Sequence, residues 1–218
     1  MVAEGVFVTG MFASYCTVDD VLRLVAGYDL SALGTAEEVA GRIRALLGPT
    51  RAGIDGAAGR DFLFHPRDQR SVDGTGSDRI SLAQLGVSPV VRVESLSVDG
   101  QEIPQTEYAW YSQEGTLRLK PGGRLSGRFP AGVQNVTLVL DWGYFQPPVD
   151  IRVAQAKLVG AELLAAAAGD RGSVESLRLG DYAISYSAGG EHAACIKRWV
   201  EEAHRIASSY RVPRLMAV

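Results

Sequence analysis

The apolar positions of this chain follow a helical period toward both ends and an alternating period in the middle. After residue 35, apolar side chains recur at three- and four-residue steps, on one face of a helix: Val39, Ile43, Leu46 and Leu47. From about Asp61 to Tyr144 the period changes to two, as in strands with one buried face. The helical period returns after residue 150, so the pattern predicts helices, then antiparallel strands, then helices again.

Capping signals predict where the first helices begin. Thr17 and Asp20 have the spacing of a capping box, which predicts a short helix over residues 18–26. The same pattern in Thr35–Glu38 begins a stronger helix. We expect Pro49 to stop or kink that helix, because proline lacks the N–H that the helix needs, with a further turn or two after it.

The middle of the chain predicts several short strands. Asp99-Gly100 is a strong hairpin signal, and it closes two series of apolar positions: Ile80 and Leu82, then Val91, Val93, Leu96 and Val98. Residues 116–120 and 136–141 are the clearest strands. Other turns are expected at Asp73-Gly74, Glu114-Gly115, Gly122-Gly123 and Ala131-Gly132. Four large aromatic side chains are expected to pack the core of this region: Trp110, Tyr111, Trp142 and Tyr144.

The last third predicts two long helices with an extended segment between them. Residues 150–168 form the longest helical pattern, with a stripe of Ala154, Leu158, Ala161, Leu163 and Leu164. Residues 182–187 alternate like a strand or an extended arm. A final helix over residues 191–210 has this core side: Cys195, Ile196, Trp199, Val200, Ala203 and Ile206.

The predicted fold class is therefore α+β: a helical bundle of N-terminal helices and two long C-terminal helices, with an inserted antiparallel β-rich region. The expected boundaries are 1–60 for the N-terminal helical segment, 61–146 for the β-rich insert, 147–210 for the C-terminal helices and their arm, and 211–218 for a tail.

Composition and charge narrow the range of functions that the chain can have. The chain has 218 residues, 46% hydrophobic and 22% charged, with a net charge of −3, so no massed cations point to DNA binding. The apolar N-terminus has no basic region before it and contains Glu4, which favours a cytosolic start without a membrane span. Cys16 and Cys195 lie far apart without C-x-x-C spacing; buried thiols are expected, and a disulfide between them stays an open alternative.

The sequence has no recognisable catalytic or metal-binding motif. His65, His192 and His204 have no metal-ligand spacing, and the glycines near Gly74 lack the lysine of a phosphate-binding loop. Ser77 has no nucleophile elbow around it. Acidic and basic residues cluster between residues 60 and 79, where a solvated loop of mixed charge is favoured over a cation site. No cofactor, no metal and no enzymatic activity are expected.

Several loose motifs occur in a fixed order. The first two are G-x-G-S-x-x-I-x-L over residues 74–82 and S-P-V-x-x-V-x-S-L-x-V-D-G over residues 88–100, and the strand segment Leu117–Lys120 follows them. The aromatic segment Trp142–Phe145 and the proline-led helix start Pro147–Arg152 come next. The last motif is E-S-x-x-L-G-D-Y-A-I-S-Y over residues 175–186. This order resembles the head-tail connector, or head-completion adaptor, proteins of tailed bacteriophages and of phage-like gene transfer particles. The resemblance spans about residues 35 to 210.

The resemblance implies a structural adaptor that links the portal to the tail or stopper around the DNA channel. Such a protein is made in the host cytoplasm and acts in the virion, at the head-tail junction. Its implied partners are further copies of itself, in a ring that is typically twelvefold on the portal, the portal protein, and a tail-side completion or stopper protein. DNA would pass through without specific binding, and no membrane is involved.

Three groups of residues are candidate contact sites. The family docks on the portal through its terminal helix and tail, which here contain Tyr210, Arg211, Val212, Arg214, Leu215 and Met216. An alternating strand outside the main sheet is a candidate for contact between subunits: Glu175, Leu177, Leu179, Asp181, Tyr182, Ile184 and Tyr186. A loop facing the tail or a neighbour contains Gly74, Gly76, Ser77 and Asp78.

Two other classes of protein remain as alternatives. The first is a monomeric β-sandwich-type module that binds carbohydrate or peptide on the aromatic residues named above. Helices on both sides of the β-rich region count against it. The second is a hydrolase with a site among the acidic loops, for which the sequence supplies no nucleophile and base.

Overall fold

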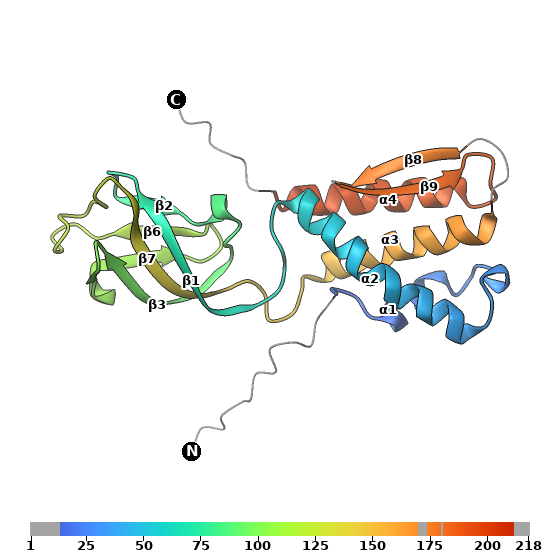
Figure 1. Ribbon diagram of the computed structural model, residues 1–218, viewed down its shortest axis with the longest axis horizontal. Coiled ribbons are helices and arrows are strands. Elements are labelled where there is room, and N and C mark those ends of the chain that lie inside the picture. The colour runs from blue at the N-terminus through green and yellow to red at the C-terminus, as the bar shows by residue number, and fades with distance from the viewer. Residues whose placement is uncertain (1–13, 170–173, 180, 212–218) are drawn as a thin grey trace, which may run out of the picture. The chain divides into compact units, whose positions relative to one another are not determined.

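The computed structural model describes residues 14–169, 174–179 and 181–211. Within them the chain forms two compact units (Figure 1). The helical unit comes from the chain up to Ala58 and from Pro147 to Arg211, and the β unit is Gly59–Gln146. Helices and antiparallel sheets are both present, which confirms the α+β class.

The helical unit contains four α-helices and a β-hairpin among its described residues. The helices are α1 (Val18–Val25), α2 (Ala36–Ala58), α3 (Val149–Ala168) and α4 (Ala193–Ser209), and a 3-10 turn, η1 (Ser31–Leu33), joins α1 to α2. The hairpin pairs β8 (Val174–Leu179) with β9 (Tyr182–Ser187). Both predicted capping boxes are confirmed: Thr17 exchanges hydrogen bonds with Asp20, and Thr35 with Glu38.

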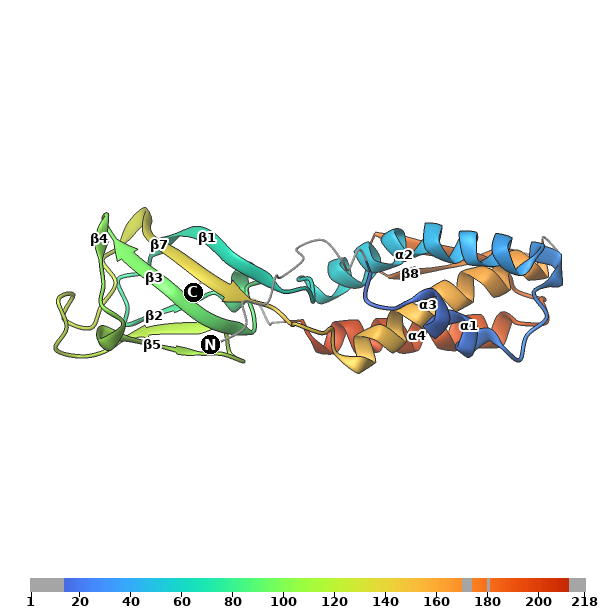
Figure 2. The same ribbon diagram turned by 90° about the horizontal axis from the view of Figure 1, so that it is seen from below.

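Helix α3 is the centre of the helical unit, and α1, α2 and α4 all pack on it (Figure 2). The predicted stripe on α3 is confirmed, and Gln155, Ala156 and Val159 are buried as well. Small residues allow close approach: a Cβ added to Gly160 would lie 2.8 Å from Cζ3 of Trp199 on α4. On α4 itself Ile196, Trp199, Val200 and Ala203 are buried as predicted, whereas Cys195 and Ile206 are only half-buried.

Gln155 joins three segments in the middle of this core. Its Oε1 accepts the backbone N–H groups of Tyr15 and Cys16 at 2.6 and 2.8 Å. Its Nε2 donates to the carbonyl of Leu47 at 2.7 Å and to Oγ1 of Thr50 at 3.3 Å. Since the side chain is fully buried, these bonds satisfy an amide that would otherwise be costly to bury.

Pro49 does not stop helix α2, which is one continuous element over Ala36–Ala58; the alternative that Pro49 kinks the helix stays a prediction. The helix ladder around the proline is supported by side chains. Thr50 Oγ1 donates to the carbonyls of Leu46 and Leu47, at 2.7 and 3.2 Å, and Gln155 donates to Leu47. Packing of α2 on α3, together with these bonds, helps to hold the helix across the missing N–H.

The β unit contains two antiparallel sheets that share one core. The first sheet has the order β1 (His65–Gly74), β7 (Gly132–Trp142), β3 (Val90–Val98) and β4 (Gln101–Glu102). The second has the order β2 (Arg79–Ser81), β6 (Thr116–Leu119) and β5 (Tyr108–Tyr111). Short 3-10 turns, η2 (Ala83–Leu85) and η3 (Gln105–Glu107), connect them, and one buried cluster includes side chains of both sheets.

Two side chains of the β unit that were predicted to be buried are exposed. Val91 is 39% exposed and Val90 is buried instead, because β3 shifts register against β7 between Val90 and Arg92 and again between Val93 and Ser95. Tyr111, expected in the core, is 46% exposed at the end of β5. Trp142 is buried as expected.

The predicted hairpin at Asp99-Gly100 is confirmed. Val98 pairs with Gln101, and the two residues between them have φ of 50° and 77°, as a two-residue turn of the primed type requires. Gly74 differs from its prediction: it is the last residue of β1, paired with Gly132, and not the centre of a turn. A Cβ there would lie 1.9 Å from the carbonyl oxygen of Pro130, so glycine is needed for close approach.

Candidate functional site

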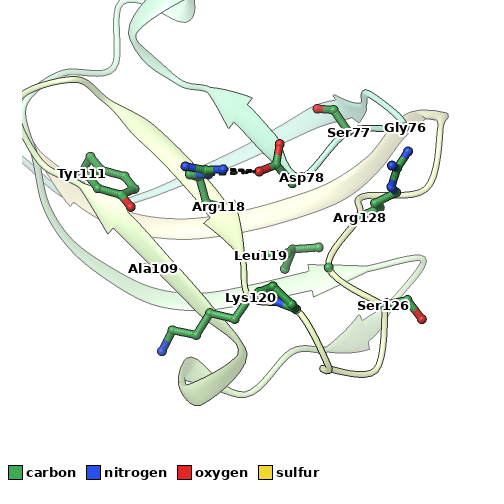
Figure 3. A pocket seen from close by; sticks show the side chains of 12 residues that line it. Gly76, Ser77, Asp78, Ala109, Tyr111, Arg118, Leu119, Lys120, Ser126 and Arg128 are labelled. Carbon is green, nitrogen blue, oxygen red and sulfur yellow. Dashed lines mark hydrogen bonds and ion pairs between the residues drawn. The ribbon is translucent and has the colours of Figure 1, made fainter.

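The loop that the sequence singled out lines a hollow on the β unit (Figure 3). Gly76, Ser77 and Asp78 form one part of its wall, and β5, β6 and the segment after β6 form the rest. The hollow has a volume of about 650 Å³. Its remaining lining is Ala109, Tyr111, Arg118, Leu119, Lys120, Pro121, Ser126, Gly127 and Arg128.

Side-chain hydroxyls fix the shape of this loop. Thr75 Oγ1 and Ser77 Oγ lie 2.7 Å apart, and both donate to the carbonyl of Arg79, at 3.0 and 2.8 Å. Gly76 has φ of +72°, which a glycine adopts without strain. The Ser77 hydroxyl is thus a turn-forming group, in line with the absence of a nucleophile motif around it.

The hollow carries more positive than negative charge. Asp78 forms an ion pair with Arg118 across the loop and β6, drawn as a dashed line in Figure 3. This guanidinium lowers the pKa of the Asp78 carboxyl. Lys120, whose Nζ donates to the carbonyl of Thr106 at 3.0 Å, and Arg128 add two further cations. The exposed Tyr111 lines the same hollow.

Most of the mixed charges between residues 60 and 79 have partners among one another or on neighbouring strands. His65 contacts Asp61 at 2.9 Å, Arg70 contacts Asp68 at 2.8 Å, and Asp73 accepts the N–H of Gln134 at 2.7 Å. No group of three or more potential metal ligands occurs within the part of the chain that the structure describes. The same residues include no helix long and apolar enough to cross a membrane.

The four aromatic side chains expected to pack this region, Trp110, Tyr111, Trp142 and Tyr144, do not form a common exposed platform. Trp142 is buried, stacks on His65 at 4.0 Å between ring centroids, and donates its Nε1–H to Asp68 at 2.7 Å. Trp110 is half-buried against the core, while Tyr111 is exposed. Only Tyr111 of these three therefore offers a broad face to a ligand.

Most of the predicted inter-subunit residues lie on one hairpin, and the hairpin turns its apolar face inward. Leu179, Ile184 and Tyr186 are buried within the helical unit, so these three do not present a surface to a neighbour. Leu177 and Tyr182 are half-buried. Glu175 and Asp181 are exposed, as is an outer face of small or polar residues: Val174, Ser176, Arg178, Ala183 and Ser185.

Two tyrosines anchor the hairpin through carboxylates. Tyr182 Oη donates to Glu162 Oε1 on α3 at 2.6 Å, and Tyr186 Oη donates to Glu175 Oε2 on β8 at 2.8 Å. Burial raises the pKa of Tyr186 to about 12, helped by the hydrogen bond to Glu175. Burial likewise raises the pKa of Tyr182 and that of Glu162. The first bond ties the hairpin to α3, and the second joins the two strands of the hairpin.

The predicted portal-docking residues begin at the end of α4. Tyr210 Oη donates to both carboxylate oxygens of Asp150, in the first turn of α3, at 2.9 Å. Arg211 follows and is exposed. Val212, Arg214, Leu215 and Met216 lie outside the described residues.

Both cysteines are free thiols. Cys16 is buried, and this burial raises the pKa of its thiol to about 12. Cys195 is half-buried, with its Sγ 3.1 Å from Tyr28 Oη. The open alternative of a disulfide between them is therefore not realised in this structure.

Comparisons with known proteins identify the fold. No protein-family model matches the sequence, and no curated protein matches it significantly. A chain from the neck of an empty GTA particle, computed with C6 symmetry, is similar at a TM-score of 0.51 and 16% identity, over 96% of both chains. A chain from the virion of a native gene transfer agent (GTA) particle gives 0.49, with the same identity and coverage. The protein therefore shares its two-unit α+β fold with a component of such a neck.

Proposed function

We propose that this protein is a structural head-tail adaptor of a phage-like particle, which links the portal to the tail or stopper around the DNA channel. The observation that carries the proposal is the fold match to a chain of a GTA particle neck over nearly the whole of both chains. The ordered motifs from residue 74 to residue 186 support it independently, because they are read from the sequence alone. The role requires fitted surfaces and no catalysis.

An adaptor of this kind is a ring of identical subunits. A closed ring needs two different complementary surfaces on each subunit. The helical unit offers the exposed outer face of the β8–β9 hairpin, with Glu175 and Asp181 beside it, and the β unit offers the hollow next to Gly76–Asp78. Because the hollow is rich in cations, we propose that it receives an acidic group of the next subunit or of the tail-side neighbour. Twelvefold symmetry on the portal is part of this proposal.

Size-exclusion chromatography with light scattering, with and without the portal protein, tests the function. A portal-bound species that contains several copies of the chain is expected. A stable monomer that ignores portals and is retained on a glycan column would instead favour the binding-module alternative. Monomer behaviour without the portal does not decide, because a ring can assemble on the portal itself.

The C-terminal end is the proposed portal contact, and its removal is the sharper test. Deleting residues 211–218 is expected to leave the fold intact, since the bond from Tyr210 to Asp150 and the core of α4 are retained. Portal binding measured by co-sedimentation is expected to weaken, because the deleted residues include two arginines and several apolar side chains. Unchanged binding with unchanged circular dichroism would remove this segment from the mechanism.

A further inference from the structure

The outer face of the second sheet of the β unit carries cations that its own chain neutralises only in part. Arg79 on β2 and Arg118 on β6 are direct cross-strand partners, and both are exposed. Like charges at directly opposite positions of a sheet are unfavourable. Asp78 forms an ion pair with Arg118, and Lys120 and Arg128 line the same hollow. Among the described residues neither Arg79 nor Arg128 has an ion pair, so this face keeps a positive charge that an anionic partner can neutralise.

Exposed carboxylates gather at one end of the first sheet, here called the acidic end: Asp73, Asp99 and Glu102. On β1, Asp73 Oδ1 accepts the N–H of Gln134 at 2.7 Å. The N–H of Asp99 donates to the carbonyl of Asn135 at 2.8 Å, so Asp73 and Asp99 flank the start of β7. Glu102 follows on β4. The carboxylates of Asp99 and Glu102 have no hydrogen bond or ion pair within the part of the chain that the structure describes.

The hollow and the acidic end lie on the two different sheets of the β unit, which form separate layers (Figure 2). Bases are scarce around the acidic end, because residues 93–117 include five acidic residues and no lysine or arginine. Arg124 reaches only the backbone carbonyl of Glu102, at 3.5 Å, and pairs with Glu107 at 3.6 Å. The two surfaces therefore do not neutralise each other within one chain. Two different complementary surfaces on one chain allow a heterologous contact, which repeats from copy to copy.

We infer that the hollow of one copy receives the acidic end of the β unit of the next copy, so that its carboxylates meet the cations of the hollow. With a volume of about 650 Å³, the hollow has room for several side chains. This contact rests on the proposed function, because it is one contact of the ring and names the occupant of the hollow. Its ion pairs are partly exposed, so salt weakens them.

The β8–β9 hairpin of the helical unit is the competing source of carboxylates. Glu175 already accepts the hydroxyl of Tyr186 at 2.8 Å. Arg178 lies on the exposed outer face of the hairpin, where it would repel the cations of the hollow. The acidic end offers two carboxylates that have no partner among the described residues, which favours it as the occupant.

Carbodiimide cross-linking tests this contact, because it joins a lysine Nζ to the carboxyl carbon of a touching side chain with loss of water. Lys120 is the one lysine of the β unit. Isotope-labelled and unlabelled protein are mixed, with and without the portal protein, and the cross-linked peptides are identified by mass spectrometry. Mixed-isotope peptides that join Lys120 to Asp99 or Glu102 are expected, and their yield should fall as the salt concentration rises.

Charge reversal tests the pairing itself. Arg128→Glu places a carboxylate opposite the acidic end and should lower the yield of the Lys120–Asp99 peptide about tenfold, which corresponds to about 1.4 kcal/mol. Adding Glu102→Lys to this variant should restore most of the yield, because the pair is then reversed and no longer repulsive. The matched control is Arg44→Glu, an equal reversal at an exposed position of α2, which should leave the yield unchanged.

Other outcomes would overturn the inference. Chains bound to the portal without a mixed-isotope peptide would remove this contact and leave the proposed function standing. If the chain ignores the portal, the proposed function fails, and the cross-links formed in solution alone decide the contact. Lys120 joined to the β8–β9 hairpin or to a tail-side protein would assign the hollow to another occupant. Should Arg128→Glu disturb the circular dichroism spectrum, Arg128→Gln gives the same comparison with a smaller loss.

Discussion

At the scale of single residues, buried polar groups determine how the helical unit closes. Gln155 is a polar side chain in an alanine-rich, apolar helix, and nothing in the spacing of the sequence marks it as special. Its four hydrogen bonds depend on Tyr15, Cys16, Leu47 and Thr50, which are brought together only by the fold. Sequence patterns locate the face of a helix, but they do not show which distant backbone groups will lack a partner there.

Replacing Gln155 should therefore be costly. Gln155→Leu keeps the side-chain size but leaves the buried N–H groups of Tyr15 and Cys16 unsatisfied, which should lower the free energy of unfolding by about 2 to 4 kcal/mol. Urea unfolding followed by circular dichroism measures this. The control Gln101→Leu, at an exposed position of β4, should change it by less than about 0.5 kcal/mol. Equal effects would mean that the Gln155 bonds contribute nothing.

Glu162 should make stability depend on pH. Burial raises its pKa, against the partial lowering by the Tyr182 hydrogen bond. A raised pKa in the folded state means that the folded chain binds this proton more tightly than the unfolded chain. The stabilising contribution is therefore complete below the unfolded pKa and is lost as pH rises through the folded pKa.

Glu162→Gln removes this ionisation and retains an acceptor for the Tyr182 hydroxyl. Its urea midpoint at neutral pH should exceed that of the unmodified protein, and the difference should shrink as pH falls toward about 4.3, the ordinary pKa of glutamate. Glu191→Gln, at an exposed turn, is the control. A midpoint lowered at neutral pH would contradict the proposed cost of ionisation.

At the scale of secondary-structure elements, the regular patterns of apolar and capping residues predicted the structure better than the positions that interrupt those patterns did. The caps of α1 and α2, the stripe of α3 and the hairpin at Asp99-Gly100 follow from local rules and are confirmed. The predicted helix stop at Pro49 and the predicted burial of Val91 are wrong, for physical reasons: packing on α3 carries α2 through a proline, and register shifts change the alternation in β3. Long-range pairing determines both, and local sequence does not encode it.

The close contact between α3 and α4 leads to a testable prediction about stability. Gly160→Ala should destabilise the protein by about 1 to 3 kcal/mol because the new Cβ meets Trp199. Gly41→Ala, whose Cβ would meet nothing within 4 Å on α2, should instead stabilise it by about 0.5 to 1 kcal/mol.

Trp199→Ala alone should cost about 3 to 5 kcal/mol, because the ring is buried. In that background Gly160→Ala should cost less, because its nearest obstacle is gone and only the milder contact with Val25 Cγ1, at 3.3 Å, remains tight. Thermal unfolding of the unmodified protein, the two single variants and the double variant gives the coupling free energy between positions 160 and 199. A full penalty for Gly160→Ala without the tryptophan would show that this helix contact is misplaced.

At the scale of the whole molecule, the candidate contact surfaces were only partly readable from sequence. The loop at Gly76–Asp78 was predicted and lines the hollow, but the cations opposite it, Arg118, Lys120 and Arg128, come from distant positions and were missed. The segment at residues 175–186 was predicted as an outside strand, whereas Leu179, Ile184 and Tyr186 are buried within its own unit and Leu177 is half-buried. A partner can therefore use only its exposed face and edges.

The central claim is that copies of this chain form a ring on a portal. Single-particle electron microscopy of the protein mixed with the portal protein of its particle tests this most directly. We expect a closed ring of identical subunits, twelvefold on the portal, with the C-terminal end of each chain against the portal and an open central channel. Portal particles that carry no additional density at saturating protein concentration, in a sample whose fold is confirmed by circular dichroism, would contradict it.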